Sequence, residues 1–192
     1  EGLAGSFNNI GNIYTELGDL PEALKNYRYS ARLAQELDNV RSRAQALLNL
    51  GATHLELGAP DTALIETAQS LALYRTMGRK LEQGMAHNNM GRAYGRSGWF
   101  RLAFAHLDSA EMLLADIGSM RQVIRTHINR GNLYLDQHLF TNAVNACARG
   151  AQLAEDNRLL QQTRECQQCL TTAYEGLGDY QKAFLAQRAY QN

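Results

Sequence analysis

The chain has 192 residues, of which 19 are basic and 19 acidic, so its formal net charge is zero. This balance argues against a dedicated binder of nucleic acid or of an anionic membrane, because clustered positive charge holds those partners, and no apolar run approaches the ~18 residues that span a bilayer. The hydrophobic fraction of 45% supports a packed core, and abundant leucine with only three valines is typical of an all-α protein.

Helices of two kinds alternate along the predicted structure. In the first helix, Ile10, Ile13 and Leu17 follow helical spacing, and Gly18 supplies the left-handed cap that ends a helix. Pro21 falls in the first turn of the next helix, where its missing N–H costs little. Joins of two or three residues force neighbouring helices to run antiparallel. We predict first helices at 2–17, 40–57, 80–97, 120–137 and 160–177, and second helices at 20–37, 60–77, 100–117, 140–157 and 180–191.

A repeat of forty residues underlies this alternation. Alanine recurs at that spacing five times, at Ala23, Ala63, Ala103, Ala143 and Ala183. Since one helix pair cannot bury its apolar stripe alone, the pairs must stack on one another as a solenoid. We expect a single array over 1–192, and a piece of a longer protein, because both ends fall inside helical patterns. Its repeat units lie at approximately 1–38, 39–78, 79–118, 119–158 and 159–192.

The repeated motif resembles the tetratricopeptide repeat. The resemblance is carried by Asn-Ile-Gly-Asn-Ile-Tyr at 9–14, Leu-Gly-Asp at 17–19 and Ala-Leu at 23–24, and again by residues 169–184. The forty-residue length is similar to the subclass found in kinesin light chains, spindle-orientation adaptors and bacterial signalling proteins. The resemblance implies an all-α, right-handed solenoid of five stacked antiparallel hairpins. It also implies a non-catalytic scaffold for protein–protein interaction, with the first helices lining a concave, peptide-binding face.

Several residues depart from the motif in the third and fourth repeat units. Arg130 takes a position that is apolar in the other units, and His87 and His127 take the place of Phe7 and Leu47. Gln137 and His138 replace the Leu-Gly pair that ends other first helices. We therefore expect the fourth unit to be present but less regular than the others.

By position, the resemblance implies a peptide-binding face on the first helices. Its asparagines offer donors and acceptors either to a peptide backbone or, with equal weight, to neighbouring helices. Its arginines, spaced i, i+4 on successive first helices, either clamp acidic groups of a ligand or pair with nearby carboxylates such as Glu56. The candidate site residues are Leu48, Asn49, Met85, Asn88, Asn89, Arg92, Arg96, Arg121, Arg125, Asn129 and Asn132. The same face would carry Asn8, Asn9, Asn12, Arg41 and Gln45.

The three cysteines, Cys147, Cys166 and Cys169, are predicted to be core side chains. Their odd, low count does not make a disulfide framework and indicates a reducing compartment, hence the cytoplasm. Cys166 and Cys169 have the spacing of a metal-binding pair, but no second pair completes four ligands. No nucleophile elbow, phosphate-binding loop or zinc-protease motif occurs. We therefore predict no metal, no cofactor and no enzymatic activity.

Three hypotheses for function follow. The first is a scaffold that binds a protein or peptide, with a place for acidic groups, and neither nucleic acid nor membrane. The alternative is the regulatory sensor segment of a multidomain bacterial signalling protein that carries a diguanylate cyclase, a histidine kinase or a transcription regulator. The third is self-association through the uncapped ends near Phe7 and Phe184.

Overall fold

The computed structural model describes residues 2–191, with side chains through residue 189. Within this range the secondary structure is helical and contains no strand, which confirms the all-α class. None of these helices combines the length and apolar character required of a membrane span. The helices are α1 (Leu3–Glu16), α2 (Leu20–Glu36), α3 (Val40–Glu56), α4 (Pro60–Thr76), α5 (Lys80–Arg96), α6 (Phe100–Asp116), α7 (Met120–Asp136), α8 (Phe140–Asp156), α9 (Leu160–Gly176) and α10 (Tyr180–Gln191).

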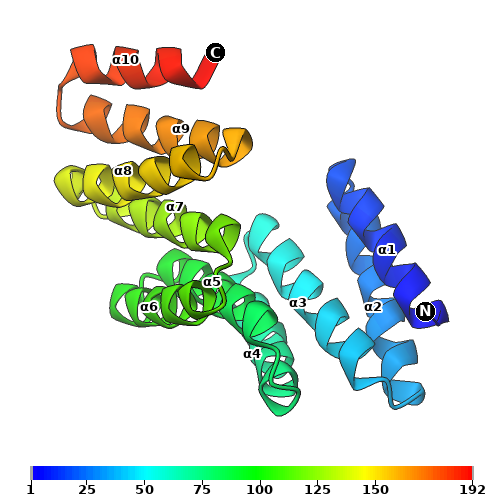
Figure 1. Cartoon of the computed structure of the whole chain (residues 1–192). Coiled ribbons are helices and arrows are strands. Elements are labelled where there is room, and N and C mark those ends of the chain that lie inside the picture. Colours follow the sequence, from blue (N-terminus) through cyan, green and yellow to red (C-terminus); the bar gives the residue numbers. More distant parts are fainter. Residues whose placement is uncertain (1, 192) are drawn as a thin grey trace. The chain divides into compact units, whose positions relative to one another are not determined.

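The chain divides into two compact bodies. The N-terminal body is Glu1–Ala103 and the C-terminal body is Phe104–Asn192, with the division inside α6. Within each body, Figure 1 shows consecutive helices joined by short turns into antiparallel hairpins. The predicted helix bounds are confirmed, because each start and end agrees to within one residue.

Tight turns with a left-handed residue end the helices. Glycine takes this place six times, whereas Asp38, His138 and Arg158 adopt φ values of 50°, 57° and 54°. A side chain in that region costs about 1–2 kcal/mol. His138 therefore makes the same turn that glycine makes elsewhere, and the departure at Gln137 and His138 leaves the hairpin of α7 and α8 intact.

Small residues let the helices of the N-terminal body approach closely. Ala63 is fully buried. A Cβ atom on Gly11 would lie 2.5 Å from a ring carbon of Tyr27, and one on Gly51 would collide with the Thr67 hydroxyl. Large side chains such as Tyr74, which is 2% exposed, fill the remaining space. The alternation of small and large residues explains why the repeat keeps alanine and glycine at fixed positions.

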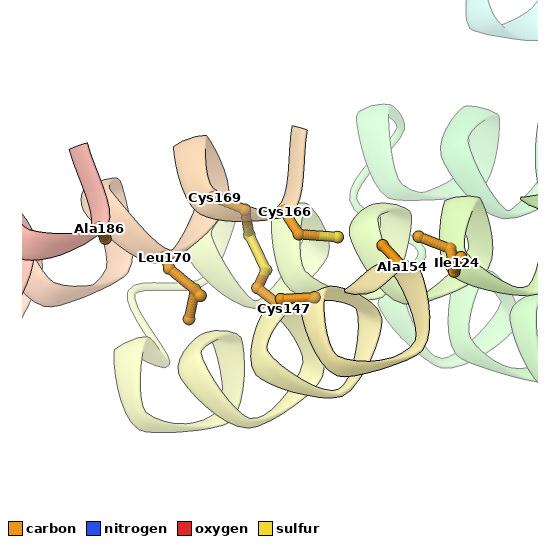
Figure 2. Packing of buried hydrophobic residues seen from close by; sticks show 8 residues of the cluster. Ile124, Cys147, Ala154, Cys166, Cys169, Leu170 and Ala186 are labelled. Carbon is orange, nitrogen blue, oxygen red and sulfur yellow. A yellow bond between two sulfur atoms is a disulfide. The ribbon is translucent and has the colours of Figure 1, made fainter. Parts of the chain in front are cut away.

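Three sulfur atoms lie in the core of the C-terminal body, among Ile124, Ala154 and other apolar side chains (Figure 2). The prediction that the cysteines are core residues is confirmed. Cys147 on α8 is joined by a disulfide to Cys169 on α9, 22 residues later, and the odd, low cysteine count did not indicate this pairing. Cys166 remains a free, buried thiol, and burial raises its pKa to about 12. It therefore stays protonated at neutral pH and is a poor nucleophile.

Candidate functional site

The first helices of the N-terminal body lie side by side. Among the described residues, α3 contacts α1 and α5, whereas α2 and α4 contact first helices but not each other. One face of this body is therefore lined by α1, α3 and α5, and we call it the inner face. Its exposed or half-buried side chains are Asn9, Asn12, Arg41, Gln45, Asn49, Ala52, Met85, Asn89, Arg92 and Arg96.

A polar pocket of about 540 Å³ opens on the inner face, between α1 and the N-terminal end of α3. Its lining contains one charged side chain, Arg41, and neither a carboxylate nor a large apolar group. The pocket therefore suits a polar ligand rather than a hydrophobic anchor. The lining residues are Gly2, Gly5, Asn8, Asn9, Asn12, Asn39, Arg41, Ser42 and Gln45.

An amide network crosses the back of this pocket. Asn49 Nδ2 donates hydrogen bonds to Asn8 Oδ1 at 3.0 Å and to Asn12 Oδ1 at 3.2 Å. Gln45 Nε2 donates to Asn49 Oδ1 at 3.2 Å. These bonds link α1 to α3, and they leave the Nδ2 groups of Asn8 and Asn12 without a partner among the described residues.

Two buried tyrosines hold the network from the second helices. Tyr27 Oη on α2 donates to Asn12 Oδ1 at 2.9 Å, and Tyr74 Oη on α4 donates to Gln45 Oε1 at 3.1 Å. Burial raises the pKa of both tyrosines, so their hydroxyls remain protonated donors at neutral pH. The side chains of the inner face are thus positioned by the hairpins that carry them.

The predicted asparagine ladder divides into two groups. Asn49 is satisfied by neighbouring helices, and Asn88 and Asn129 also have partners within the chain. Asn9, Asn89 and Asn132 form no hydrogen bond with any described residue. Of the two alternatives for these amides, the structural one therefore holds for the first group, while the second group remains available to a ligand.

The structure removes Leu48 and Asn88 from the set of accessible site residues. Each is only 2% exposed, and Leu48 packs in a core cluster with Tyr74 and Met90. Met85 is half-buried and packs against the same cluster. Helix geometry explains the correction for Leu48, since consecutive residues point about 100° apart and its neighbour Asn49 takes the inner face.

The four predicted arginines belong to different bodies, Arg92 and Arg96 to the N-terminal one and Arg121 and Arg125 to the C-terminal one. Arg92 Nη2 lies 2.5 Å from Glu56 Oε1, which is the ion pair named as the alternative to a clamp. The other three side chains are exposed and form no ion pair with a described residue. A clamp made by all four arginines stays a prediction.

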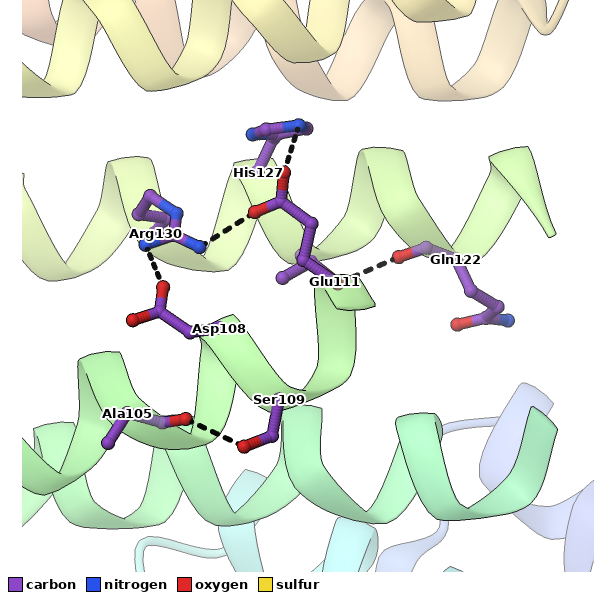
Figure 3. Close-up of polar contacts among 8 residues, drawn as sticks. Ala105, Asp108, Ser109, Glu111, Gln122, His127 and Arg130 are labelled. Atoms are coloured by element: carbon purple, nitrogen blue, oxygen red, sulfur yellow. Dashed lines mark hydrogen bonds and ion pairs between the residues drawn. The ribbon is translucent and has the colours of Figure 1, made fainter. Parts of the chain in front are cut away.

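Arg130 on α7 carries out a structural role that its position in the repeat did not indicate (Figure 3). Its Nη1 lies 2.8 Å from Asp108 Oδ1, and its Nη2 lies 2.8 Å from Glu111 Oε2. Both carboxylates are on α6, so the guanidinium ties the two helices together where other repeats use apolar packing. The arginine is compatible with a regular hairpin because its charge is neutralised at the interface.

Two buried histidines also face carboxylates. His54 Nδ1 lies 2.6 Å from Glu66 Oε2, and burial raises the pKa of that carboxyl. His127 Nε2 lies 3.6 Å from Glu111 Oε1, and burial is the main reason its pKa is lowered. No group of three or more His, Cys, Asp or Glu side chains within residues 2–189 is arranged to hold a metal ion.

Sequence reasoning missed several parts of the pocket. Asn39 caps the start of α3, with Oδ1 accepting from the Ser42 N–H at 3.0 Å, and both side chains line the pocket. The cap itself was a usable signal, because asparagine before a helix is a strong N-cap. Tyr27 and Tyr74 gave no such signal, since their hydroxyls find the network only after the helices pack.

Comparison with known proteins places this geometry in context. The family model "Tetratricopeptide repeat" matches residues 2–76. No curated protein matches the sequence. Among solved structures, a Rap protein complexed with Competence and Sporulation Factor is 15% identical with a TM-score of 0.87, and the match covers 96% of this chain and 52% of that one.

Two further structures share the fold. A putative kinesin light chain of Podosopora anserina with nearly identical TPR-like repeats is 16% identical with a TM-score of 0.71, over 97% of this chain and 92% of that one. A signal-transduction ATPase from Pyrococcus horikoshii with a tetratricopeptide repeat sensor is 14% identical with a TM-score of 0.70, over 96% of this chain and 29% of that one.

This chain therefore spans about half of the Rap protein and under a third of the ATPase. At these identities the likeness establishes the fold alone. Repeat proteins of this fold are generally non-catalytic scaffolds for protein interaction. Residues 2–76, the first two hairpins, match the tetratricopeptide-repeat family model, and the described chain has the fold of solved tetratricopeptide-repeat proteins.

Proposed function

We propose that the chain is a non-catalytic module that binds an extended peptide or protein segment on the inner face of its N-terminal body. The observation that carries this proposal is the pocket between α1 and α3, whose lining keeps unpaired polar groups at an open surface. Such groups pair with the backbone of an extended peptide irrespective of its sequence. The Rap protein, which has the same fold, was solved with a bound factor, and this supports the assignment by analogy.

We further propose that the ligand carries acidic groups. Arg41 and Arg96 of the N-terminal body are exposed and form no ion pair with a described residue. Unpaired guanidinium groups favour carboxylate or phosphate partners, which they bind through two parallel hydrogen bonds. The net charge of zero is then the sum of basic and acidic residues that lie on different parts of the surface.

A second candidate function is a sensor segment within a larger signalling protein. The similarity to the tetratricopeptide repeat sensor of the signal-transduction ATPase favours it, since this chain matches under a third of that protein. A sensor also binds a ligand, so the two proposals share the inner face. Reading the full-length gene tests this one: an effector domain supports it, and a chain confined to these repeats contradicts it.

Self-association is a third candidate, favoured by the two end helices. Ile10 on α1 is 39% exposed, whereas its equivalent Leu50 is 3% exposed. Phe184 on α10 is 59% exposed, whereas its equivalent Leu24 is 9% exposed. Light scattering over a concentration series tests it, because a mass that stays at one chain removes this candidate.

Peptide display against the whole chain tests the main proposal. Asn9→Trp places a bulky side chain on the inner face, at a residue that makes no hydrogen bond with a described residue. Gln69→Trp places the same side chain on the exposed side of α4 and serves as the matched control. We expect selected peptides to bind Asn9→Trp at least tenfold more weakly, with Gln69→Trp unchanged. Equal affinity for both variants and the wild type contradicts the proposal.

A further inference from the structure

The disulfide of the C-terminal body lies where polar contacts join the helices of the N-terminal body. Cys147 and Cys169 stand at the repeat positions of Tyr27 and Asn49, and both of those residues donate a hydrogen bond to Asn12. Neutral hydrogen bonds therefore hold α1, α2 and α3 together, whereas one covalent bond joins α8 to α9. A disulfide, unlike an amide network, can be opened and closed by thiol exchange.

Helix α9 brings fewer large apolar side chains to its core than α3 does. Where α3 carries the buried Leu47 and Leu48, α9 carries Gln167, which is half-buried, and Gln168, which is exposed. Three of the five buried side chains that surround the cysteines are alanines. Since small and polar side chains bury less apolar area, the covalent bond supplies a larger share of what holds α9 in place.

The reduced thiols fit the same site. A thiol behaves as a small apolar group, so an open bond leaves no charge or strong donor in the core. Gly131 on α7 has no side chain to occupy the space of the two sulfur atoms, with which a Cβ atom would collide. The Cα atoms of Cys147 and Cys169 are 6.1 Å apart, within the range of protein disulfides, so the bond can close again without movement of the backbone.

The two bonded cysteines differ in their access to solvent. Cys169 is 5% exposed and stands at the repeat position of Asn9 and Asn89, which reach the inner face of the N-terminal body, whereas Cys147 is 0% exposed. A local opening of α9 therefore presents Cys169 to a reductant first. The Cys166 side chain points away from the bond in Figure 2, and its thiol stays protonated, so it does not attack the bond itself.

We propose that the Cys147–Cys169 bond is a reversible redox switch, which fastens α9 and α10 to the C-terminal body when closed and loosens them when open. A thiolate of a dithiol reductant attacks Cys169 Sγ, forms a mixed disulfide and expels Cys147 as a thiolate that takes up a proton. The second thiolate of the reductant then closes its own cyclic disulfide and releases Cys169, which is protonated in turn. Glutathione disulfide reverses the change, since it accepts the two electrons and leaves as two glutathione thiols. The inference goes beyond the proposed function and does not rest on it, because it concerns the other body.

Hydrogen–deuterium exchange of the whole chain tests the switch. The chain closed by glutathione disulfide is compared with the chain opened by dithiothreitol. We expect exchange in α9 and α10 to be roughly tenfold faster or more in the open form, because the tether no longer limits their local unfolding. Helices α1 to α4 are the internal control and should exchange alike in both forms, since the N-terminal body contains no cysteine.

Reversibility is measured by differential alkylation and mass spectrometry at a series of ratios of glutathione to glutathione disulfide. We expect one transition, between a closed Cys147–Cys169 pair and two thiols, with the same midpoint from either direction. Cys166 should be recovered as a thiol at every ratio, because burial keeps it protonated.

Two variants assign the response to the bond. Cys169→Ala removes the pair, so exchange in α9 should no longer depend on the redox buffer. Cys166→Ala is the matched control, because it removes the free thiol from the same core and keeps the pair. We expect the redox response of Cys166→Ala to match that of the wild type.

Four results overturn the inference. They are equal exchange of α9 and α10 in the two buffers, a bond that excess glutathione does not open or glutathione disulfide does not close, pairing that involves Cys166, and a redox response that survives Cys169→Ala. The comparison of wild-type chains stands alone if a variant fails to fold. Peptide binding by Asn9→Trp and Gln69→Trp bears on the proposed function and leaves the switch untouched.

Discussion

The two bodies join equivalent first helices to their neighbours with different chemistry. In the N-terminal body, neutral amides link α1 to α3, with Asn49 donating to Asn8 and Asn12. In the C-terminal body, charges link α7 to α6, with Arg130 held by two carboxylates. The charged link neutralises itself, whereas the amide link leaves donors facing an open pocket. A repeat fold thus accepts either kind of polar contact, and a binding surface arises where the contact leaves groups unpaired.

We expect the largest effect when a core side chain is removed from a helix that lines the inner face. Leu48→Ala removes a side chain that is 2% exposed, whereas Ile128→Ala changes the equivalent, half-buried position of the C-terminal body. Leu48→Ala should destabilise by about 2–5 kcal/mol, and Ile128→Ala by less, because the deeper site leaves the larger cavity. Urea denaturation measures both. A smaller loss of stability for Leu48→Ala than for Ile128→Ala would contradict the deeper burial of Leu48.

A close approach in the C-terminal body gives the next largest effect. A Cβ atom on Gly131 would collide with the sulfur atoms of Cys147 and Cys169. Gly131→Ala should therefore cost about 1–3 kcal/mol through overpacking. The neighbouring Asn132→Ala, at an exposed residue, is the control and should change stability by less than ~0.5 kcal/mol. Thermal unfolding followed by circular dichroism decides, and equal melting of the two variants would refute the packing.

The salt dependence of stability distinguishes the charged contacts of Arg130 from the neutral hydrogen bonds of Asn49. Arg130→Ala should cost about 1–2 kcal/mol, because its guanidinium is 17% exposed but Asp108 is 67% exposed and solvated. Part of this loss of stability should vanish in 1 M NaCl, where charges are screened beyond ~3 Å. Asn49→Ala should cost about 1 kcal/mol at any salt concentration, because its bonds are between neutral groups. Equal salt dependence of the two variants would contradict the distinction.

The smallest effect we expect is that the stabilities of the two bodies change in opposite directions as the pH falls. His127 has a lowered pKa, so the unfolded chain takes up this proton first as pH falls below about 6.5, and the C-terminal body loses stability there. Glu66 has a raised pKa, so its carboxyl stays protonated in the folded N-terminal body at pH values above 4.5, where the unfolded chain has already released the proton. The stability of this body therefore rises as the pH falls through that window. Hydrogen exchange at amides of α7 and α3 follows each body. His127→Gln and Glu66→Gln should each abolish the trend in its own body, and persistence of either trend would assign it to other groups.

Much of the fold was predictable because its signals recur at fixed spacing. Gly18 and its equivalents ended the first helices correctly, and Ala63 marked a close helix contact. The partners of polar side chains were not predictable, because whether an amide such as Asn49 meets Asn8 depends on rotamers and on the distance between helices. The same holds for the disulfide of Cys147, since residues 22 apart in sequence meet only after α8 and α9 pack.

The candidate site was predictable to the level of a helix face and no further. Positional matching placed Asn89 and Arg96 on the inner face, where Asn89 is half-buried and Arg96 is exposed. It also included the buried Leu48 and Asn88, because membership of a first helix does not specify the direction of each side chain. Which polar atoms of the pocket are already paired could be learned only from the hydrogen-bond directions, which depend on the packed helices.

Hydrogen–deuterium exchange of the chain with a display-selected peptide tests the central claim most directly. If the inner face of the N-terminal body is the binding surface, the peptide should slow exchange in α1, α3 and α5, most strongly at the start of α3 around Ser42. Helices α2 and α4 should change little, since they lie behind that face. Slowed exchange confined to α2 and α4 would show that the ligand binds the opposite side and would contradict the account.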